Sequence, residues 1–246
     1  PSSMSGTSPP VSIRNHNTIG FNGKLTYFYE QLHKSILTHE TSNTLQLNVR
    51  RQYVFEDSFR QFQGRNGNEI KYSKINVKFH DEEGVDAGGV TREWFTVLSH
   101  QIFDPDYALF ISSSVDKVTH QPNKASHVNP EHLHFFKFIG RMIGKAIFSE
   151  VTLDAYFTRS FYKHILGKPV EFKDLEANDK QFYDSMVWTL ENDITEHMFL
   201  TFSDDIEIFG EKKIIPLKPD GENIPVTEEN KKEYVKLITE FRLYTA

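Results

Sequence analysis

The most restrictive feature of this 246-residue chain is that it contains no cysteine. A chain without cysteine has no disulfide framework, no thiolate zinc site and no thiol nucleophile of its own. A hydrophobic core must therefore hold the fold, and 21 phenylalanines and 10 tyrosines supply large apolar area for one. The length of the chain suits one large domain or two unequal subdomains.

Charge and hydropathy argue against two classes of protein. The chain has 28 basic and 34 acidic residues, so we expect no nucleic-acid partner, because such proteins usually carry a basic surplus. No apolar run long enough to cross a bilayer occurs, so we expect no membrane association. Residues 1–20 are rich in Ser, Pro, Asn and Gly and lack the apolar segment of a signal peptide, which predicts a linker or disordered terminus. These features predict an intracellular protein of the cytoplasm or nucleus.

The first two thirds of the chain are predicted to be mainly helical. Apolar residues recur every three or four positions over residues 21–36 and again over 131–148, which is the period of an α-helix. In the second of these stretches the predicted buried stripe is Leu133, Phe136, Ile139, Ile143 and Ile147. A further helix is predicted around 155–166. Residues 45–49 and 75–79 instead alternate apolar and polar side chains, which predicts two strands.

The pattern changes beyond Pro169. Residues 176–191 predict one helix, and short apolar runs over 200–217 predict short strands. A strong turn signal follows at residues 218–221, with the sequence KPDG. A last helix is predicted from Thr227 through Phe241.

We therefore predict an α+β fold with two subdomains. Residues 21–173 would form a large, mainly helical subdomain with short strands. Residues 174–240 would form a small mixed α/β subdomain, and residues 241–246 would begin a return to the large one.

The residues alone do not indicate a self-contained active site. His132 and His134 would point to different sides of a helix, and no third ligand follows at the spacing of a metal site. The acidic turn at 81–89 lacks the spacing of a calcium loop and the lysine of a phosphate loop, so a capped turn with Asp86 at a helix start is favoured. No G-x-S-x-G segment indicates a hydrolase. We expect no metal and no cofactor.

A surface for a protein partner is better supported. Phe182, Met186 and Leu190 fall four residues apart on the helix predicted for 176–191. Such a stripe is usually core, but the helix has apolar residues on two adjoining faces, so one face could remain open as a groove. Exposed apolar grooves with methionine and aromatic residues are typical of binding surfaces.

Seven segments, taken in order, form a recognisable pattern: LQLNVRRQYVFEDSF (45–59), FHDEEGVDAGGVTREWF (79–95), DYALF (106–110), HFFKFIGRMIGKAI (134–147), YFTRSFYKHILGK (156–168), LTFS (200–203) and LKPDGENIPVTEENKKEYV (217–235). In this order they resemble the amino-terminal lobe of HECT-type ubiquitin ligases. The likeness spans about residues 22–246. Its details resemble the very large Mule-type ligases and their fungal counterparts.

This resemblance implies a two-lobed enzyme. Its first lobe has a large subdomain and a small one that docks the E2 ubiquitin-conjugating enzyme. Its second lobe carries a cysteine that takes ubiquitin from E2 as a thioester and passes it to a substrate lysine. This chain would stop before the second lobe, so we expect the fragment to be inactive alone. Substrates would be recruited through regions outside it.

The resemblance also implies which side chains form the E2 groove. They are Phe182, Ser185, Met186, Asn192, Met198 and Tyr234. Asn192 departs from the family pattern, in which an aromatic is common, and the loop at 192–198 is shorter. We predict that Met186→Asp abolishes docking without unfolding the large subdomain. The alternative is a non-catalytic module that binds ubiquitin or another protein and has lost E2 docking.

Overall fold

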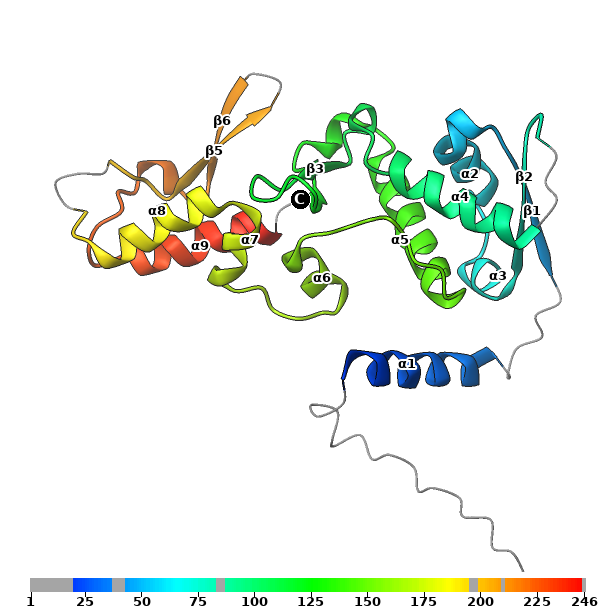
Figure 1. Cartoon of the computed structure of the whole chain (residues 1–246). Coiled ribbons are helices and arrows are strands. Elements are labelled where there is room, and N and C mark those ends of the chain that lie inside the picture. Colours follow the sequence, from blue (N-terminus) through cyan, green and yellow to red (C-terminus); the bar gives the residue numbers. More distant parts are fainter. Residues whose placement is uncertain (1–19, 37–42, 83–86, 195–198, 209–210, 245–246) are drawn as a thin grey trace, which may run out of the picture.

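The structure is a computed structural model that describes residues 20–36, 43–82, 87–194, 199–208 and 211–244 (Figure 1). Its helices and strands are α1 (Phe21–Ile36), β1 (Thr44–Val49), α2 (Val54–Phe62), α3 (Gly67–Tyr72), β2 (Lys74–Phe79), α4 (Ala87–Gln101), β3 (Phe110–Ser112), β4 (His120–Pro122), α5 (His132–Phe148), α6 (Arg159–Ile165), α7 (Leu175–Asn178), α8 (Lys180–Glu191), β5 (Ser203–Ile208), β6 (Glu211–Pro216) and α9 (Lys231–Tyr244). The α+β prediction is confirmed, since helices predominate and the described strands form two-stranded sheets. Asp86 and all but the last residue of the predicted linker lie outside the described residues.

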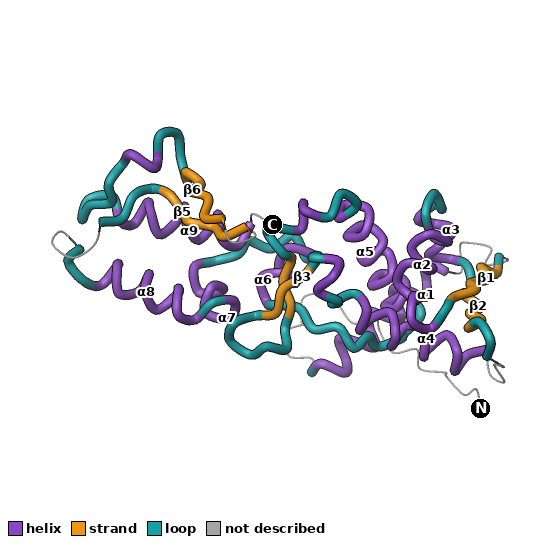
Figure 2. Tube along the Cα trace, turned by 90° about the horizontal axis from the view of Figure 1, so that it is seen from above, coloured by secondary structure: helices purple, strands orange, loops and turns teal. Residues whose placement is uncertain are grey.

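The described elements form an elongated arrangement with two buried clusters. In Figures 1 and 2, β1 and β2 lie at one end, and α8, α9, β5 and β6 lie at the other. The larger cluster, called the large core, takes its residues from β1 through Phe157. The smaller one, called the small core, consists of Met186, Ile194, Phe202, Val226, Tyr234, Val235 and Ile238. The exact subdomain boundaries at 173 and 240 stay a prediction.

The large core is built around a parallel strand pair and packed aromatic rings. β1 and β2 align with Leu45 opposite Ile75, and α2 and α3 provide the crossover that parallel strands need. Their alternating inward side chains pack against α2 and α4, as the period-two pattern predicted. The fully buried ring of Phe55 has its centroid 5.2 Å from that of Phe135, which links α2 to α5.

The stripe predicted for α5 is only partly the buried one. Phe135, Phe138, Ile139, Met142, Lys145 and Ala146 are buried. Leu133, by contrast, is 69% exposed, and Ile147 is also exposed. Apolar residues surround much of this helix, so periodicity alone could not select the face that meets α2 and α3. Gly140 and Gly144 of α5 are not required by a close neighbour among the described residues, because a Cβ at either would meet open space.

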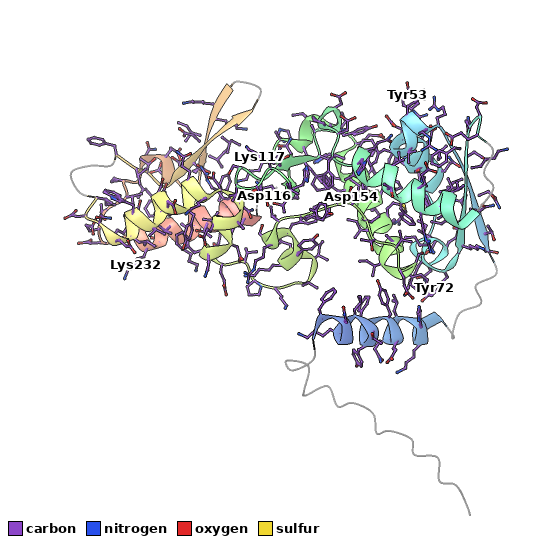
Figure 3. The ribbon with its side chains drawn as sticks, in the orientation of Figure 1. Tyr53, Tyr72, Asp116, Lys117, Asp154 and Lys232 are labelled. Carbon is purple, nitrogen blue, oxygen red and sulfur yellow. The ribbon has the colours of Figure 1, made fainter. Side chains whose placement is uncertain are left out.

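Helix α1 confirms the predicted helix but buries little of it. Phe21 and Phe28 are exposed, and the side chains of α1 extend away from the helix in Figure 3. An ion pair between His33 and Glu150, 2.8 Å apart, ties α1 to the residues that follow α5. Its amphipathic pattern therefore produces a helix without a well-packed face.

Two helices begin at a later residue than the sequence predicted. The helix expected around 155–166 begins only at Arg159, because Phe157 forms a β-bridge with His120. The last helix begins at Lys231 rather than Thr227 and continues to Tyr244. The intervening residues form a turn in which the Asn230 side chain accepts a hydrogen bond from the Thr227 amide, at 2.7 Å.

The strands predicted for 200–217 are confirmed as an antiparallel hairpin of β5 and β6. The preceding residues contribute a single bridge between Thr201 and Pro225 instead of a strand. The turn at 218–221 is also present, with Asp220 in the left-handed region at φ 59°. Gly221 follows because a Cβ there would collide with the carbonyl oxygen of Phe202.

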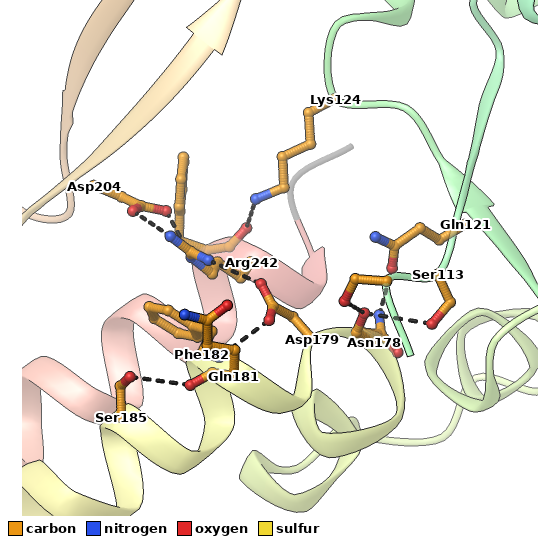
Figure 4. Close-up of polar contacts among 12 residues, drawn as sticks. Ser113, Gln121, Lys124, Asn178, Asp179, Gln181, Phe182, Ser185, Asp204 and Arg242 are labelled. Carbon is orange, nitrogen blue, oxygen red and sulfur yellow. Dashed lines mark hydrogen bonds and ion pairs between the residues drawn. The ribbon is translucent and has the colours of Figure 1, made fainter. Parts of the chain in front are cut away.

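A polar seam joins the two ends of the molecule (Figure 4). The Ser113 hydroxyl donates to the carbonyl of Ala177 at 3.0 Å, and the Asn178 amide donates to Gln121 at 2.6 Å. Lys124 donates to the carbonyl of Phe241 at 3.4 Å, and burial lowers the pKa of Lys124 to about 8. Hydrogen bonds of this kind fix how α7 and α9 meet the β3–β4 region.

Candidate partner-binding site

Helix α8 carries most of the predicted site, and Asp179 determines where it begins. The Asp179 side chain accepts a hydrogen bond from the Phe182 amide at 3.0 Å, which caps the helix. Its extended backbone separates α8 from the short helix α7, so the single helix predicted for 176–191 is wrong. An aspartate competes with the helix for its own backbone donors, and a run of helical periodicity conceals this break.

The inner face of α8 packs into the small core. Met186 is 3% exposed, and Tyr234 of α9 is also 3% exposed. The ring of Tyr234 meets that of Phe202 edge to face, with 5.7 Å between centroids. Burial raises the pKa of Tyr234 to about 12.

Met186 and Tyr234 were expected on an open groove, and both instead lie inside the core. The apolar stripe at every fourth residue of α8 faces the small core, to which α9 and Phe202 also contribute, and this is the ordinary outcome for such a stripe. A charge at position 186 would be buried among apolar side chains. Met186→Asp would therefore change the folding of the small core as well as any partner contact, and the E2-binding role of both residues stays a prediction.

Phe182 lies half-buried at the start of α8, beneath Arg242 (Figure 4). The guanidinium carbon of Arg242 is 3.5 Å from the centre of the Phe182 ring. The same guanidinium donates to both carboxylate oxygens of Asp204, at 2.9 and 2.8 Å, and lies 3.7 Å from Asp179. Arg242 thus joins α9, β5 and the cap of α8, and its stacking covers one face of the Phe182 ring.

Two of the remaining predicted residues are exposed. The Ser185 hydroxyl donates to the carbonyl of Gln181 at 3.0 Å, and the Asn192 amide donates to the carbonyl of Trp188 at 3.0 Å. Both can contact a partner from the outer side of α8. Met198 lies outside the described residues.

Two exposed aromatic side chains were missed in the sequence. Trp188 is 42% exposed on the outer face of α8, and Phe199 is fully exposed in the connection between α8 and β5. Trp188 borders a shallow hollow that is lined by Lys180, Gln181, Asp184, Ser185 and Trp188. A helical projection could have found Trp188, because it falls about 200° around the helix from the buried Met186.

Other kinds of site have little support in the described part of the chain. There, no three His, Asp or Glu side chains gather closely enough to bind a metal ion. Among the same residues, no helix is both long enough and apolar enough to cross a bilayer. The outer face of α8 and the exposed Phe199 therefore remain the best-supported site among the described residues.

Comparison with known proteins identifies the family of the chain. The HECT-domain (ubiquitin-transferase) family matches residues 96–246, which is more than half of the chain. The chain belongs to the HECT family. The matched residues include α8, α9 and the β5–β6 hairpin, so this HECT chain carries the candidate site within the matched region.

Relatives of the HECT chain are named ubiquitin ligases. The E3 ubiquitin-protein ligase TOM1-like of Neurospora crassa is 52% identical over 247 residues, covering 100% of this chain and 6% of that protein. The E3 ubiquitin-protein ligase TOM1 of Saccharomyces cerevisiae is 47% identical, over 95% of this chain and 7% of that protein. The E3 ubiquitin-protein ligase HUWE1 of Mus musculus is 45% identical, over 92% of this chain and 5% of that protein. The resemblance to Mule-type ligases and their fungal counterparts is confirmed, and the chain spans a small part of their length.

Proposed function

We propose that this chain is the part of a HECT-type E3 ubiquitin ligase that docks a ubiquitin-charged E2 enzyme. The observation that carries the proposal is the pair of exposed aromatics, Trp188 and Phe199, beside the small core of a HECT-family chain. Large aromatic side chains left in solvent at the edge of a small core are typical anchors for a protein partner.

The surroundings of these two residues fit a transient interface. Ser185 is exposed beside Trp188, and the neighbouring ion pair between Lys180 and Asp184, 3.0 Å apart, gives a polar rim. Interfaces with few apolar anchors and a polar rim bind with weak to moderate affinity. Such affinity suits an enzyme that must exchange a discharged E2 for a charged one.

The chemistry in this proposal uses a thiol that the chain does not contain, since it has no cysteine. A cysteine thiolate elsewhere in the ligase would attack the thioester carbonyl of ubiquitin on E2, and the E2 thiolate would leave. The amine of a substrate lysine would then attack the new thioester and release the ligase thiolate. This chain contributes position to the first step, and regions outside it would recruit substrates. The proposal implies action in the cytoplasm or nucleus, where ubiquitin is conjugated.

The test is a titration of the chain with a panel of E2 enzymes by NMR or calorimetry. We expect saturable binding to at least one E2, and a loss of roughly tenfold or more in affinity with Phe199→Ala, as for an interface anchor. Phe21→Ala is the matched control, because it removes another exposed phenylalanine ring, from α1. It should bind E2 as the unmodified chain does.

Either of two results would contradict the proposal. A folded chain that binds no E2 but binds free ubiquitin or another protein would favour the non-catalytic interaction module. Equal losses for Phe199→Ala and Phe21→Ala would remove the α8–β5 connection from the site.

A further inference from the structure

Lys231, the first residue of α9, is a lysine that is only 8% exposed. Its ammonium nitrogen lies 2.7 Å from the carbonyl oxygen of Asn192 and 2.8 Å from one carboxylate oxygen of Glu228. The other oxygen of Glu228 accepts a hydrogen bond from the Ile194 amide at 2.8 Å. One ammonium and one carboxylate therefore hold the first residues that follow α8.

The far side of the α8–β5 connection is attached to the same segment of chain. The Val226 amide donates to the carbonyl of Leu200 at 2.8 Å, and the Phe202 amide donates to the carbonyl of Ile224 at 3.1 Å. Residues 224–231 thus hold both flanks of the connection, at 192–194 and at 200–202. One short segment of chain is therefore bonded to both flanks, and the first flank begins 39 residues before Lys231 in sequence.

The exposed aromatics adjoin these two flanks. Trp188 is one helical turn before Asn192, whose amide donates to its carbonyl at 3.0 Å. Phe199 immediately precedes Leu200. Trp188 and Phe199 therefore adjoin two flanks that are both bonded to residues 224–231.

Core packing does not require a charge at position 231. Burying an ammonium costs hydration free energy, and an ion pair of this kind adds little to stability compared with an apolar side chain of similar volume. The pair instead orients the backbone after α8, because Lys231 donates to the carbonyl of Asn192 and Glu228 accepts from the amide of Ile194. The hydrogen bond from the Lys231 ammonium also lowers the pKa of the Glu228 carboxyl.

We propose that Lys231 and Glu228 are positioning residues for partner binding. They hold the 192–194 flank so that Trp188 and Phe199 are presented together, and they need not touch the partner themselves. This inference rests on the proposed E2-docking function. It assigns a specific role to a buried lysine and to its more exposed glutamate partner.

The test compares Lys231→Met with Lys232→Met. Methionine preserves most of the apolar stem of lysine and removes the ammonium, and Lys232 is an exposed neighbour on the same helix. Two quantities are measured for each variant: hydrogen exchange of the Ile194 amide in the free chain, and affinity for an E2 that binds the unmodified chain. Exchange of the Phe202 and Ile238 amides reports whether the small core stays folded.

We expect Lys231→Met to speed Ile194 exchange and to weaken E2 binding about tenfold, a loss of the size seen when an anchor is displaced, with the small core unchanged. Lys231→Arg should restore affinity to within about threefold, because a guanidinium can donate to both acceptors. Lys232→Met should match the unmodified chain in both measurements. If Lys231→Met unfolds the small core, Glu228→Ala supplies the same test from the half-exposed side of the pair.

Wild-type affinity in a folded Lys231→Met or Glu228→Ala variant would overturn the positioning role, and loss of binding in Phe199→Ala would then still support E2 docking. Unchanged Ile194 exchange in both variants would show that Lys231 and Glu228 do not hold the 192–194 flank, and would also overturn the inference. Absence of E2 binding by the unmodified chain would overturn the docking function and this inference together.

Discussion

The large core and the surface beside the small core use aromatic side chains in opposite ways. In the large core, Phe55 is fully buried, and its ring centroid lies 4.5 Å from that of Tyr107 and 5.7 Å from that of Phe138. Around the small core, Trp188 and Phe199 are exposed. The difference teaches that a high aromatic content serves cohesion in one region and, under the proposed function, recognition in the other.

The chain contains two tryptophans, and they separate the two regions experimentally. Trp94 is fully buried in the large core, where its indole N–H donates to the Ser58 hydroxyl at 2.9 Å. Trp188 lies on α8, outside the small core. Trp188→Phe leaves a fluorescent reporter of the large core, and Trp94→Phe leaves a reporter of the small one.

The largest expected effect is on the large core. Phe55→Ala should lower its free energy of unfolding by about 3–5 kcal/mol, because it removes a buried ring and leaves a cavity among other rings. Urea unfolding followed by Trp94 fluorescence measures the loss. Phe21→Ala, an exposed ring removed from α1, should change the same quantity by less than about 0.5 kcal/mol. Similar losses for the two variants would mean that Phe55 is not central to this core.

A smaller loss is expected for the small core. Met186→Ala should destabilise it by about 2–3 kcal/mol, the lower end for such truncations, because a small core can partly collapse around the gap. The Trp188 signal should shift to lower urea concentration while the Trp94 signal stays in place. Equal shifts of both signals would show that the cores unfold as one cooperative unit, and the contrast between them would then not extend to stability.

A pH-dependent effect distinguishes the large core further. Lys145 is buried and donates to the carbonyls of Lys71 and Ser73 at 2.9 and 2.7 Å, with its pKa lowered by burial to about 8. Below that pH the amine is charged in both the folded and the unfolded chain, so the full cost of burying the charge is present. As pH rises from about 8 to the ordinary lysine value near 10.5, the folded state loses its proton first and this cost disappears.

Stability of the unmodified chain should therefore rise relative to Lys145→Met over this pH range, by at most about 3 kcal/mol. Chemical unfolding of both proteins at pH 7, 8.5 and 10 measures the difference, and the comparison cancels other groups that titrate there. A difference that stays constant with pH would mean that Lys145 keeps its ordinary pKa in the folded chain.

The smallest expected effect on stability belongs to the exposed face of α8. Trp188→Ala should change the unfolding free energy of the small core by less than about 0.5 kcal/mol, because its side chain remains largely in water. Under the proposed function, the same change should weaken E2 binding roughly tenfold. Amide exchange of small-core residues measures the first quantity, and calorimetry the second. A large loss of stability would place Trp188 with the core and not with the binding surface.

Much of the local structure could be predicted from sequence. Strict alternation at 45–49 and 75–79 predicted β1 and β2, and the three- to four-residue period predicted α1 and α5. The KPDG sequence predicted the turn that the left-handed Asp220 forms. These features depend on neighbours along the chain, so the sequence contains the information they need.

The sequence by itself also determined the absence of a thiol and the family of the chain, whereas tertiary structure decided which side chains are accessible. Leu133 and Phe135 of α5 are both apolar, and only the position of α2 buries Phe135 and leaves Leu133 exposed. Met186 and Trp188 differ in the same way. The contact of Lys231 with Asn192 joins residues 39 apart, so no local pattern could reveal it. Burial and long-range hydrogen bonds are properties of the packed chain, because they depend on which elements meet in space.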